Sequence, residues 1–248
     1  MKIRVDGSDH ITTALLLAAG SGRRLRPLTD DQPKCLTEID GVPILERLVD
    51  RLLDHGIRRL VVVVGHLEDR IREFLESRQA DLSIEYVVNS QYRTTNNMYS
   101  LWLARNSIQK SFLLLESDLF FEPLLLGELL LPNRIAVSLM QPWMNGSTVS
   151  IDHLQMVQAF QLGERHTTSD VRFKTVNICS LSLEVWYQVI ERMEQRVSRG
   201  EVNEFYESVF AEMVDDYSLS FRAILFDPAA WYEIDTLRDL QRVESLLS

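Results

Sequence analysis

Two glycines and a cluster of basic residues lie close together near the start of the chain, in the stretch LAAGSGRRLRPLTDDQPK at residues 17–34. Gly20 and Gly22 permit tight turns and let backbone N–H groups approach a ligand closely. Three arginines and Lys34 fall in the same stretch, although the whole chain carries a net charge of -10. Because phosphates are bound by backbone N–H groups and by Lys or Arg side chains, this stretch predicts a phosphate-binding loop.

The spacing of this loop excludes two common phosphate-binding motifs. A P-loop requires GxxxxGK followed by Ser or Thr, and a dinucleotide fingerprint requires a third glycine where this chain has Leu25. Neither motif matches. A surface turn with solvated arginines stays open, but it would leave the gathering of glycines and basic residues without a purpose.

Acidic residues that could hold a divalent cation occur at two distant points of the sequence. Asp118 follows the apolar run FLLLES, so it is expected at the carboxyl edge of a sheet, on the same rim as the glycine loop. Asp235 ends the segment WYEID, and Glu233 lies two residues earlier on the same face of a strand. Magnesium prefers one or two carboxylates together with phosphate oxygens and water. Taken alone, each acid could be a solvated residue, and Asp235 could simply stabilise a helix N-terminus.

Short apolar runs alternate with amphipathic stretches along the chain, which predicts a β-sheet covered by helices that would position these residues. In the first half the sequence predicts strands at 14–17, 59–64, 83–88 and 112–115 and helices at 43–55 and 68–75. After Pro132 it predicts strands at 135–139, 148–151, 156–160, 175–181 and 221–225 and helices at 184–199, 204–214 and 236–247. We therefore expect an α/β fold with a doubly wound, mostly parallel central sheet and a small antiparallel addition.

The loop at residues 17–34 resembles the signature of the nucleotidyltransferase family that includes the sugar-1-phosphate nucleotidyltransferases. That signature is LAAGxGxRLxPxTxxxPK, and the chain matches every fixed position. The resemblance implies a Rossmann-like nucleotidyltransferase fold in which Arg24 and Lys34 are catalytic cations near the α-phosphorus. It also implies a Mg²⁺ site on Asp118 and Asp235, although Ser117 replaces the usual glycine. The nucleotide-binding residues implied are Leu17, Ala18, Ala19, Gly20, Ser21, Gly22, Arg24 and Lys34.

The segment NSQYRTTNNMYSLWLA at residues 89–104 departs from the sugar enzymes, which carry a glycine-rich turn there. This segment and the WYEID ending resemble the bacterial phosphocholine cytidylyltransferases and the cytidylyltransferase domain of 2-aminoethylphosphonate enzymes. The resemblance implies that Asn96, Asn97 and Ser100 hold the ribose and base or shape the loop that does so. The same residues could instead cap the helix that follows.

Two segments of the second half, PWMNGSTVSID and FKTVNICSLS, look closer to the aminoethylphosphonate group. The resemblance implies that Lys174 meets the phosphonate and that Asn177 and Glu233 also contact the acceptor. Trp143 has loop-like neighbours, which suits a pocket that holds a choline headgroup by cation–π attraction, whereas a primary ammonium would require carboxylates. Lys174 could otherwise be a solvated strand residue, and Asn177 a turn or edge residue.

These residues together predict a magnesium-dependent cytidylyltransferase that moves CMP from CTP onto a small acceptor such as 2-aminoethylphosphonate or phosphocholine. The alternatives are a sugar-1-phosphate nucleotidyltransferase that uses UTP or dTTP, and a regulatory protein that binds a nucleotide without catalysis. We expect one domain over 1–248, with nucleotide binding at about 11–131 and acceptor binding and the second metal ligand at about 132–248.

Composition narrows the remaining possibilities. The acidic balance argues against a broad surface for nucleic acid or anionic membrane, because both require clustered basic residues. Cys35 and Cys179 lie far apart without metal-like spacing, so neither a disulfide framework nor a zinc site is expected. The amino end is polar, and the apolar run at 14–19 is too short to span a bilayer. We expect a cytoplasmic protein whose partners are CTP and a small acceptor, and the sequence does not indicate an oligomeric state.

Overall fold

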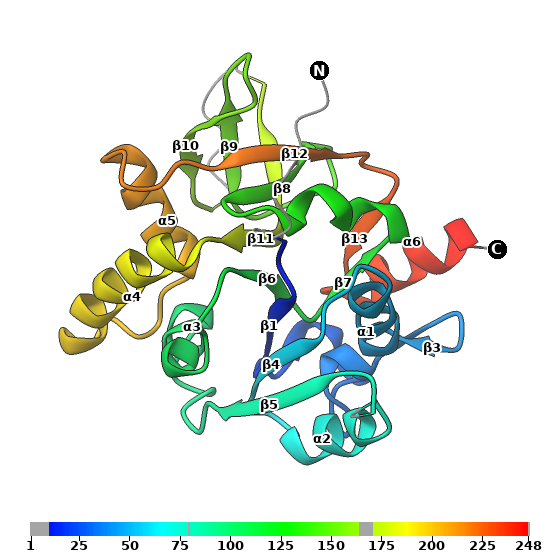
Figure 1. Ribbon diagram of the computed structural model, residues 1–248. Coiled ribbons are helices and arrows are strands. Elements are labelled where there is room, and N and C mark those ends of the chain that lie inside the picture. The colour runs from blue at the N-terminus through cyan, green and yellow to red at the C-terminus, as the bar shows by residue number, and fades with distance from the viewer. Residues whose placement is uncertain (1–9, 79, 164–170, 248) are drawn as a thin grey trace.

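The computed structural model describes residues 10–78, 80–163 and 171–247 of the chain (Figure 1). Its centre is a parallel sheet in the order β6, β1, β4, β5. These strands are β1 (Thr13–Ala18), β4 (Arg59–Val64), β5 (Ser83–Val88) and β6 (Phe112–Glu116). Nearly every residue of β1 and β4 is buried, which is why both strands read as unbroken apolar runs in the sequence.

Helices cover both faces of this sheet, and alternate residues of β1 face the two layers. Leu16 packs in one core with α1 (Ile44–Asp54), α2 (Glu68–Glu76) and α6 (Leu237–Leu247). Leu15 and Leu17 pack in the other core with α3 (Asn97–Leu103), α4 (Leu183–Ser198) and α5 (Tyr206–Asp215). The predicted α/β fold with a doubly wound central sheet is therefore confirmed.

The second half of the chain extends the sheet beyond β6. There β11 (Phe173–Leu181) runs antiparallel to β6 and to β8 (Arg134–Leu139), and β12 (Arg222–Phe226) runs parallel to β8. Strands β9 (Thr148–Ile151) and β10 (Val157–Gln161) form an antiparallel pair at the edge. The described residues thus build one mixed sheet, with the expected antiparallel strands added to its parallel half.

Two small ladders and four short 3₁₀ helices complete the description. The ladder of β7 (Leu119–Phe121) with β13 (Trp231–Glu233) matters most, because it joins the end of β6 to the late acidic segment. The other ladder pairs β2 (Glu38–Ile39) with β3 (Val42–Pro43). The 3₁₀ helices are η1 (Arg23–Leu25), η2 (Lys34–Leu36), η3 (Ala104–Asn106) and η4 (Pro123–Leu130).

Helix ends follow their sequence signals. Gly56, just after α1, adopts the left-handed conformation with φ 81°, and its N–H donates to Leu53 O at 3.0 Å. Thr236 caps α6, since its hydroxyl accepts from Asp239 N at 3.3 Å while the Asp239 carboxylate accepts from Thr236 N at 2.8 Å. Within the described ranges, no helix combines the length and apolarity that crossing a membrane requires.

Candidate active site at the carboxyl edge of the sheet

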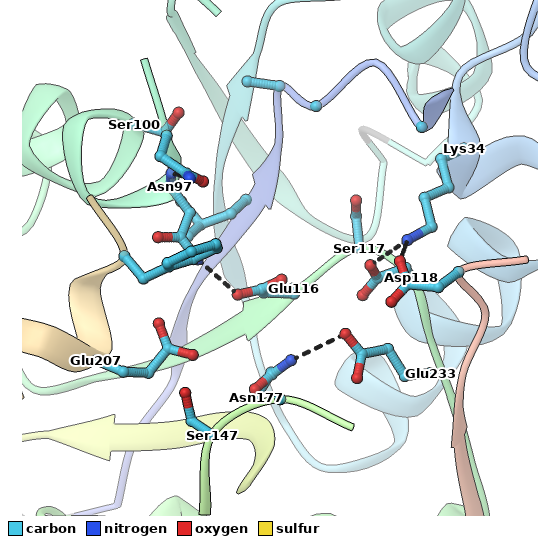
Figure 2. A pocket seen from close by; sticks show the side chains of 18 of the residues that line it. Lys34, Asn97, Ser100, Glu116, Ser117, Asp118, Ser147, Asn177, Glu207 and Glu233 are labelled. Atoms are coloured by element: carbon cyan, nitrogen blue, oxygen red, sulfur yellow. Dashed lines mark hydrogen bonds and ion pairs between the residues drawn. The ribbon is translucent and has the colours of Figure 1, made fainter. Parts of the chain in front are cut away.

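A cavity of about 760 Å³ opens where β1, β5 and β6 end. Its walls come from the glycine loop, the start of α3, the turn after β6, the middle of β11 and the start of α5 (Figure 2). Segments far apart in the chain meet here because parallel strands all end at one edge of a sheet. Four residues that the sequence predicted to be functional line this cavity: Lys34, Asp118, Lys174 and Asp235.

The glycine loop is held in a specific shape by its own residues. Gly22 has φ 58°, and a Cβ there would lie 3.0 Å from both Lys34 Cβ and Thr29 Cγ2. The Thr29 hydroxyl donates to Gly22 O at 2.8 Å, and Leu25 is fully buried beneath the loop. Any side chain at position 22 would therefore be strained and would push against Lys34. Leu17, Ala19, Gly20, Ser21, Gly22 and Arg24 all line the cavity, while Ala18 points into the core of α1.

Lys34 lies between the two aspartates that the sequence indicated. Its Nζ donates to Asp118 Oδ2 at 2.5 Å and to Asp235 Oδ1 at 2.6 Å. Burial opposes the charged ammonium, but the two carboxylates outweigh this effect and raise the pKa of Lys34 above its ordinary value. Arg24 also pairs with Asp235 at 2.7 Å, although its side chain is largely exposed. Lys34 therefore stays charged at any ordinary pH.

Three carboxylates could together hold a metal ion. Asp118, Glu233 and Asp235 each offer an oxygen, and these oxygens lie within 4.8 Å of one another. The β7–β13 ladder holds them together, and Ile234 N donates to Asp118 O at 2.9 Å. Burial raises and Lys34 lowers the pKa of Asp235, with a net lowering, so this carboxylate is ionised at neutral pH. Asp118 Oδ1 is buried without a hydrogen-bond partner among the described residues, as expected of a metal ligand.

The asparagines expected to bind the nucleotide also hold the local backbone. Asn96 is the N-cap of α3, and its side chain accepts from Asn97 N at 2.9 Å. Ser100 is buried and its hydroxyl accepts from Asn89 Nδ2 at 2.9 Å, while the same amide donates to Thr95 at 3.1 Å. Asn96, Asn97 and Ser100 line the cavity as well, so capping and ligand contact are compatible. Asn89, which shapes this loop, was missed in the sequence.

The expected acceptor residues gather on the opposite wall, on β11 and β13. Lys174 is only 3% exposed, so it is not a solvated strand residue. Its Nζ donates to Thr175 O at 2.7 Å and lies 3.4 Å from Glu233 Oε2. Asn177 donates to Glu233 Oε1 at 3.4 Å and has φ 60°, within an irregular stretch of β11 that turns its side chain into the cavity. Burial raises the pKa of Glu233, and Lys174 partly opposes that shift.

Trp143 does not line the main cavity, although it lies next to this wall. It lines a small adjoining pocket of about 50 Å³, which shares Lys174 and Glu233 with the main cavity, and its side chain is 46% exposed. The Arg242 guanidinium lies 4.5 Å from the centre of its ring. One ring face of Trp143 is therefore already in contact with a cation of the chain itself.

Two further acids, Glu116 and Glu207, line the cavity and had no part in the sequence expectations. Glu116 ends β6 two residues before Asp118, so its place at the strand end was a usable signal. Glu207 lies in the first turn of α5, and nothing in the sequence marked it. Burial raises the pKa of both carboxyls, and the negative charge of Asp118 raises that of Glu116 further.

Comparison with known proteins agrees with this geometry. Residues 14–132 match the family model described as a MobA-like NTP transferase domain. Residues 14–132 of the chain belong to this nucleotidyltransferase family. This nucleotidyltransferase is 30% identical over 242 residues to the CMP-5'-(3-aminopropyl)phosphonate synthase of Streptomyces rubellomurinus, over 93% of this chain and 38% of that protein. The family membership that the loop signature suggested is thereby confirmed.

Two further relatives extend the comparison. The nucleotidyltransferase is 30% identical over 116 residues to the choline-phosphate cytidylyltransferase of Streptococcus pneumoniae, over 47% of this chain and 49% of that protein. It therefore spans less than half the length of both curated relatives. The solved structure of the CTP:phosphocholine cytidylyltransferase from Streptococcus pneumoniae has a TM-score of 0.82 and 20% identity, over 96% of this chain and 100% of that one. This likeness supports the fold.

Proposed function

We propose that this nucleotidyltransferase moves CMP from CTP onto a small phosphonate or phosphate acceptor and releases pyrophosphate. The observation that carries the proposal is the shared cavity in which Lys34 joins Asp118 to Asp235 and in which Lys174 contacts the third carboxylate, Glu233. Two substrates that must react need adjacent sites, and here Lys34 and the buried Lys174 offer two cations suited to phosphorus oxyanions within one cavity. The names of two relatives, which specify a CMP-phosphonate and a choline phosphate, support the choice of base and acceptor class.

In this proposal the triphosphate lies along the glycine loop. Backbone N–H groups around Gly20 and Gly22 face its oxygens, and Arg24 and Lys34 supply positive charge. Lys34 is held by two carboxylates, so its ammonium has a defined position before substrate arrives. A preorganised cation stabilises the charge that develops at the α-phosphorus without further rearrangement.

Asp118, Asp235 and Glu233 would hold magnesium. The set fits this ion because all three donors are carboxylate oxygens and because Asp118 Oδ1 is buried without a partner among the described residues. When bound, the ion would neutralise the phosphate oxygens and polarise the reacting phosphoryl group.

The acceptor is placed by the β11 wall. Lys174 and Asn177 would orient the phosphonate or phosphate so that one of its oxygens attacks the α-phosphorus in line. A bond forms between that oxygen and phosphorus, the bond from the α-phosphorus to the bridging oxygen breaks, and pyrophosphate leaves with the electron pair. A phosphate monoester is largely dianionic at pH 7, since its second pKa is about 6, so the nucleophile needs no general base. Consistently, no histidine is found among the described residues that line the cavity.

The experiment that tests this function is a panel of pyrophosphate-release assays. CTP, UTP, dTTP and ATP are each combined with 2-aminoethylphosphonate, phosphocholine, phosphoethanolamine and glucose 1-phosphate in the presence of Mg²⁺. We expect release with CTP and with an aminoalkyl phosphonate or phosphate. Release restricted to UTP or dTTP with glucose 1-phosphate would instead support a sugar-1-phosphate nucleotidyltransferase. Tight CTP binding without release from any pair would support a non-catalytic nucleotide-binding protein.

A further inference from the structure

Glu116 and Glu207 form an acidic pair on the cavity wall that the proposed reaction does not use. Glu116 comes from the end of β6 and Glu207 from the start of α5. Figure 2 shows the Glu207 carboxylate pointing into the cavity, between Glu116 and Ser147. In the same view Glu116 lies between Glu207 and Asp118, so Glu207 is the member of the pair farther from Lys34.

Neither carboxylate forms an ion pair within the described part of the chain. Glu207 is only 7% exposed, and although the Asn97 side chain hydrogen-bonds to its carboxyl, its Oε2 has no hydrogen-bond partner there. Glu116 accepts a hydrogen bond from Asn97 Nδ2 at 3.0 Å, and the Tyr206 hydroxyl also interacts with it. These partners are neutral. A buried carboxylate without a compensating cation is unfavourable, and two close together are more so.

Three of the four described basic residues that line the cavity already contact other carboxylates, and the fourth, Arg23, is exposed on the glycine loop. Lys34 contacts Asp118 and Asp235, and Arg24 contacts Asp235 at 2.7 Å. The Lys174 ammonium lies 3.4 Å from Glu233, and it acts on Glu207 only through longer-range attraction. Redirecting any of these cations toward Glu207 would leave another buried carboxylate unpaired. A cationic group on a ligand would supply the positive charge that this acidic pair lacks.

Resting on the cytidylyltransferase function proposed above, we infer that Glu207 and Glu116 bind a primary ammonium group of the acceptor. The acceptor then lies with its phosphonate or phosphate toward Lys174 and its amino end toward α5. The acidic pair determines specificity and takes no part in bond making.

The chemistry of the walls favours a primary ammonium over a quaternary one. A primary ammonium donates up to three hydrogen bonds, which suits open carboxylate oxygens, whereas a trimethylammonium donates none and is held by aromatic faces. The tryptophans near the acceptor wall already contact cations of the chain. Arg242 lies 4.5 Å from the Trp143 ring centre, and Lys174 Nζ lies 6.0 Å from that of Trp231.

The test compares acceptors that differ only at the ammonium, with wild-type chain, CTP and Mg²⁺. The first pair is 2-aminoethylphosphonate and n-propylphosphonate, which lacks the charge; the second is phosphoethanolamine and phosphocholine. We expect kcat/KM to be roughly 10- to 100-fold higher for the primary amine in each pair, the range of a hydrogen bond to a charged group. This comparison needs no variant, so it does not depend on a mutant that folds.

The matched variants are Glu207→Gln and Glu212→Gln, both on α5. Glu212 pairs with Arg192 and Arg196 on the outer surface, away from the cavity. We expect Glu207→Gln to raise KM for 2-aminoethylphosphonate roughly 10- to 100-fold, to leave KM for CTP unchanged and to abolish the preference over n-propylphosphonate. Glu212→Gln should leave all three quantities unchanged.

Three results would overturn the inference. Equal use of n-propylphosphonate and 2-aminoethylphosphonate by the wild-type chain would show transfer without ammonium recognition, and the proposed function would survive. A Glu207→Gln variant that slows both acceptors equally would reveal a purely structural residue. Absence of pyrophosphate release with every acceptor would remove the proposed function and the ammonium site together.

Discussion

Lys34 and Asp118 are 84 positions apart in the chain, yet Lys34 Nζ lies 2.5 Å from Asp118 Oδ2. Lys34 reaches this place from a 3₁₀ helix after the glycine loop, and Asp118 from the turn that ends β6. Asp235 completes the contact at 2.6 Å from the same ammonium. Two carboxylates hold one cation where the reaction would take place, and four predictions concern this arrangement and the neighbouring acids.

Replacing Lys34 by methionine should lower kcat by about 100- to 1000-fold, the usual effect of removing one preorganised group that stabilises the transition state. Pyrophosphate release at saturating CTP measures it. Lys110→Met is the matched control, because Lys110 is exposed and lies outside the cavity. A Lys34→Met variant with the turnover of the control would show that this ammonium is only structural.

Removing one metal ligand should weaken Mg²⁺ binding, so that the same activity requires a higher Mg²⁺ concentration. We expect a chelator to abolish pyrophosphate release and Mg²⁺ to restore it. Asp118→Asn should raise the Mg²⁺ concentration for half-maximal rate by roughly 10- to 100-fold, since one of three converging carboxylates is lost. Asp54→Asn, at the exposed end of α1, serves as control. An unchanged Mg²⁺ titration for Asp118→Asn would contradict the assignment of Asp118 as a ligand.

Gly22→Ala should destabilise the loop and the chain. The new Cβ would stand at a left-handed φ of 58° and 3.0 Å from Lys34 Cβ, so we expect a loss of about 1–3 kcal/mol in the free energy of unfolding. Thermal unfolding measures this loss, and kcat should fall as well because Lys34 is displaced. Gly127→Ala, whose Cβ would meet no atom within 4 Å, should change neither. Equal melting temperatures for the two variants would contradict the loop geometry.

Two glutamates of α5, Glu207 and Glu212, should affect the pH dependence of stability in opposite directions. Burial raises the pKa of Glu207, so between its unfolded value of about 4.3 and its folded pKa the folded chain binds more protons, and stability falls as pH rises. Glu207→Gln removes this loss and should raise the melting temperature at pH 8 more than at pH 4. Hydrogen bonds from Arg196 lower the pKa of Glu212, so Glu212 contributes stability above its unfolded pKa that is lost as pH falls. Glu212→Gln should therefore lower the melting temperature at pH 8, and a shift of equal sign in both variants would refute the prediction.

Much of the fold could be predicted from the chain because its signals are local. The run of valines in β4 and the apolar residues at helical spacing in α1 predict which side chains are buried, and the glycine loop matches a long motif of fixed spacing. The contact between Lys34 and Asp118 could be anticipated, since both follow strands that end at one edge. Glu207 could not, because its role depends on how α5 packs against β10 and on which cations of the cavity are already paired. Those facts belong to the folded molecule and leave no pattern in the sequence.

The β7–β13 ladder places Trp231–Glu233 against residues that come directly after Asp118. Residues 14–132, the part matched by the family model, therefore carry the loop, Lys34 and Asp118 but lack the other carboxylates of the cluster. A nascent chain that has emerged only to that point would hold a lysine with half of its counter-charge. The three carboxylates of the cluster therefore come together only after β13, close to the carboxyl end of the described residues, has paired with β7.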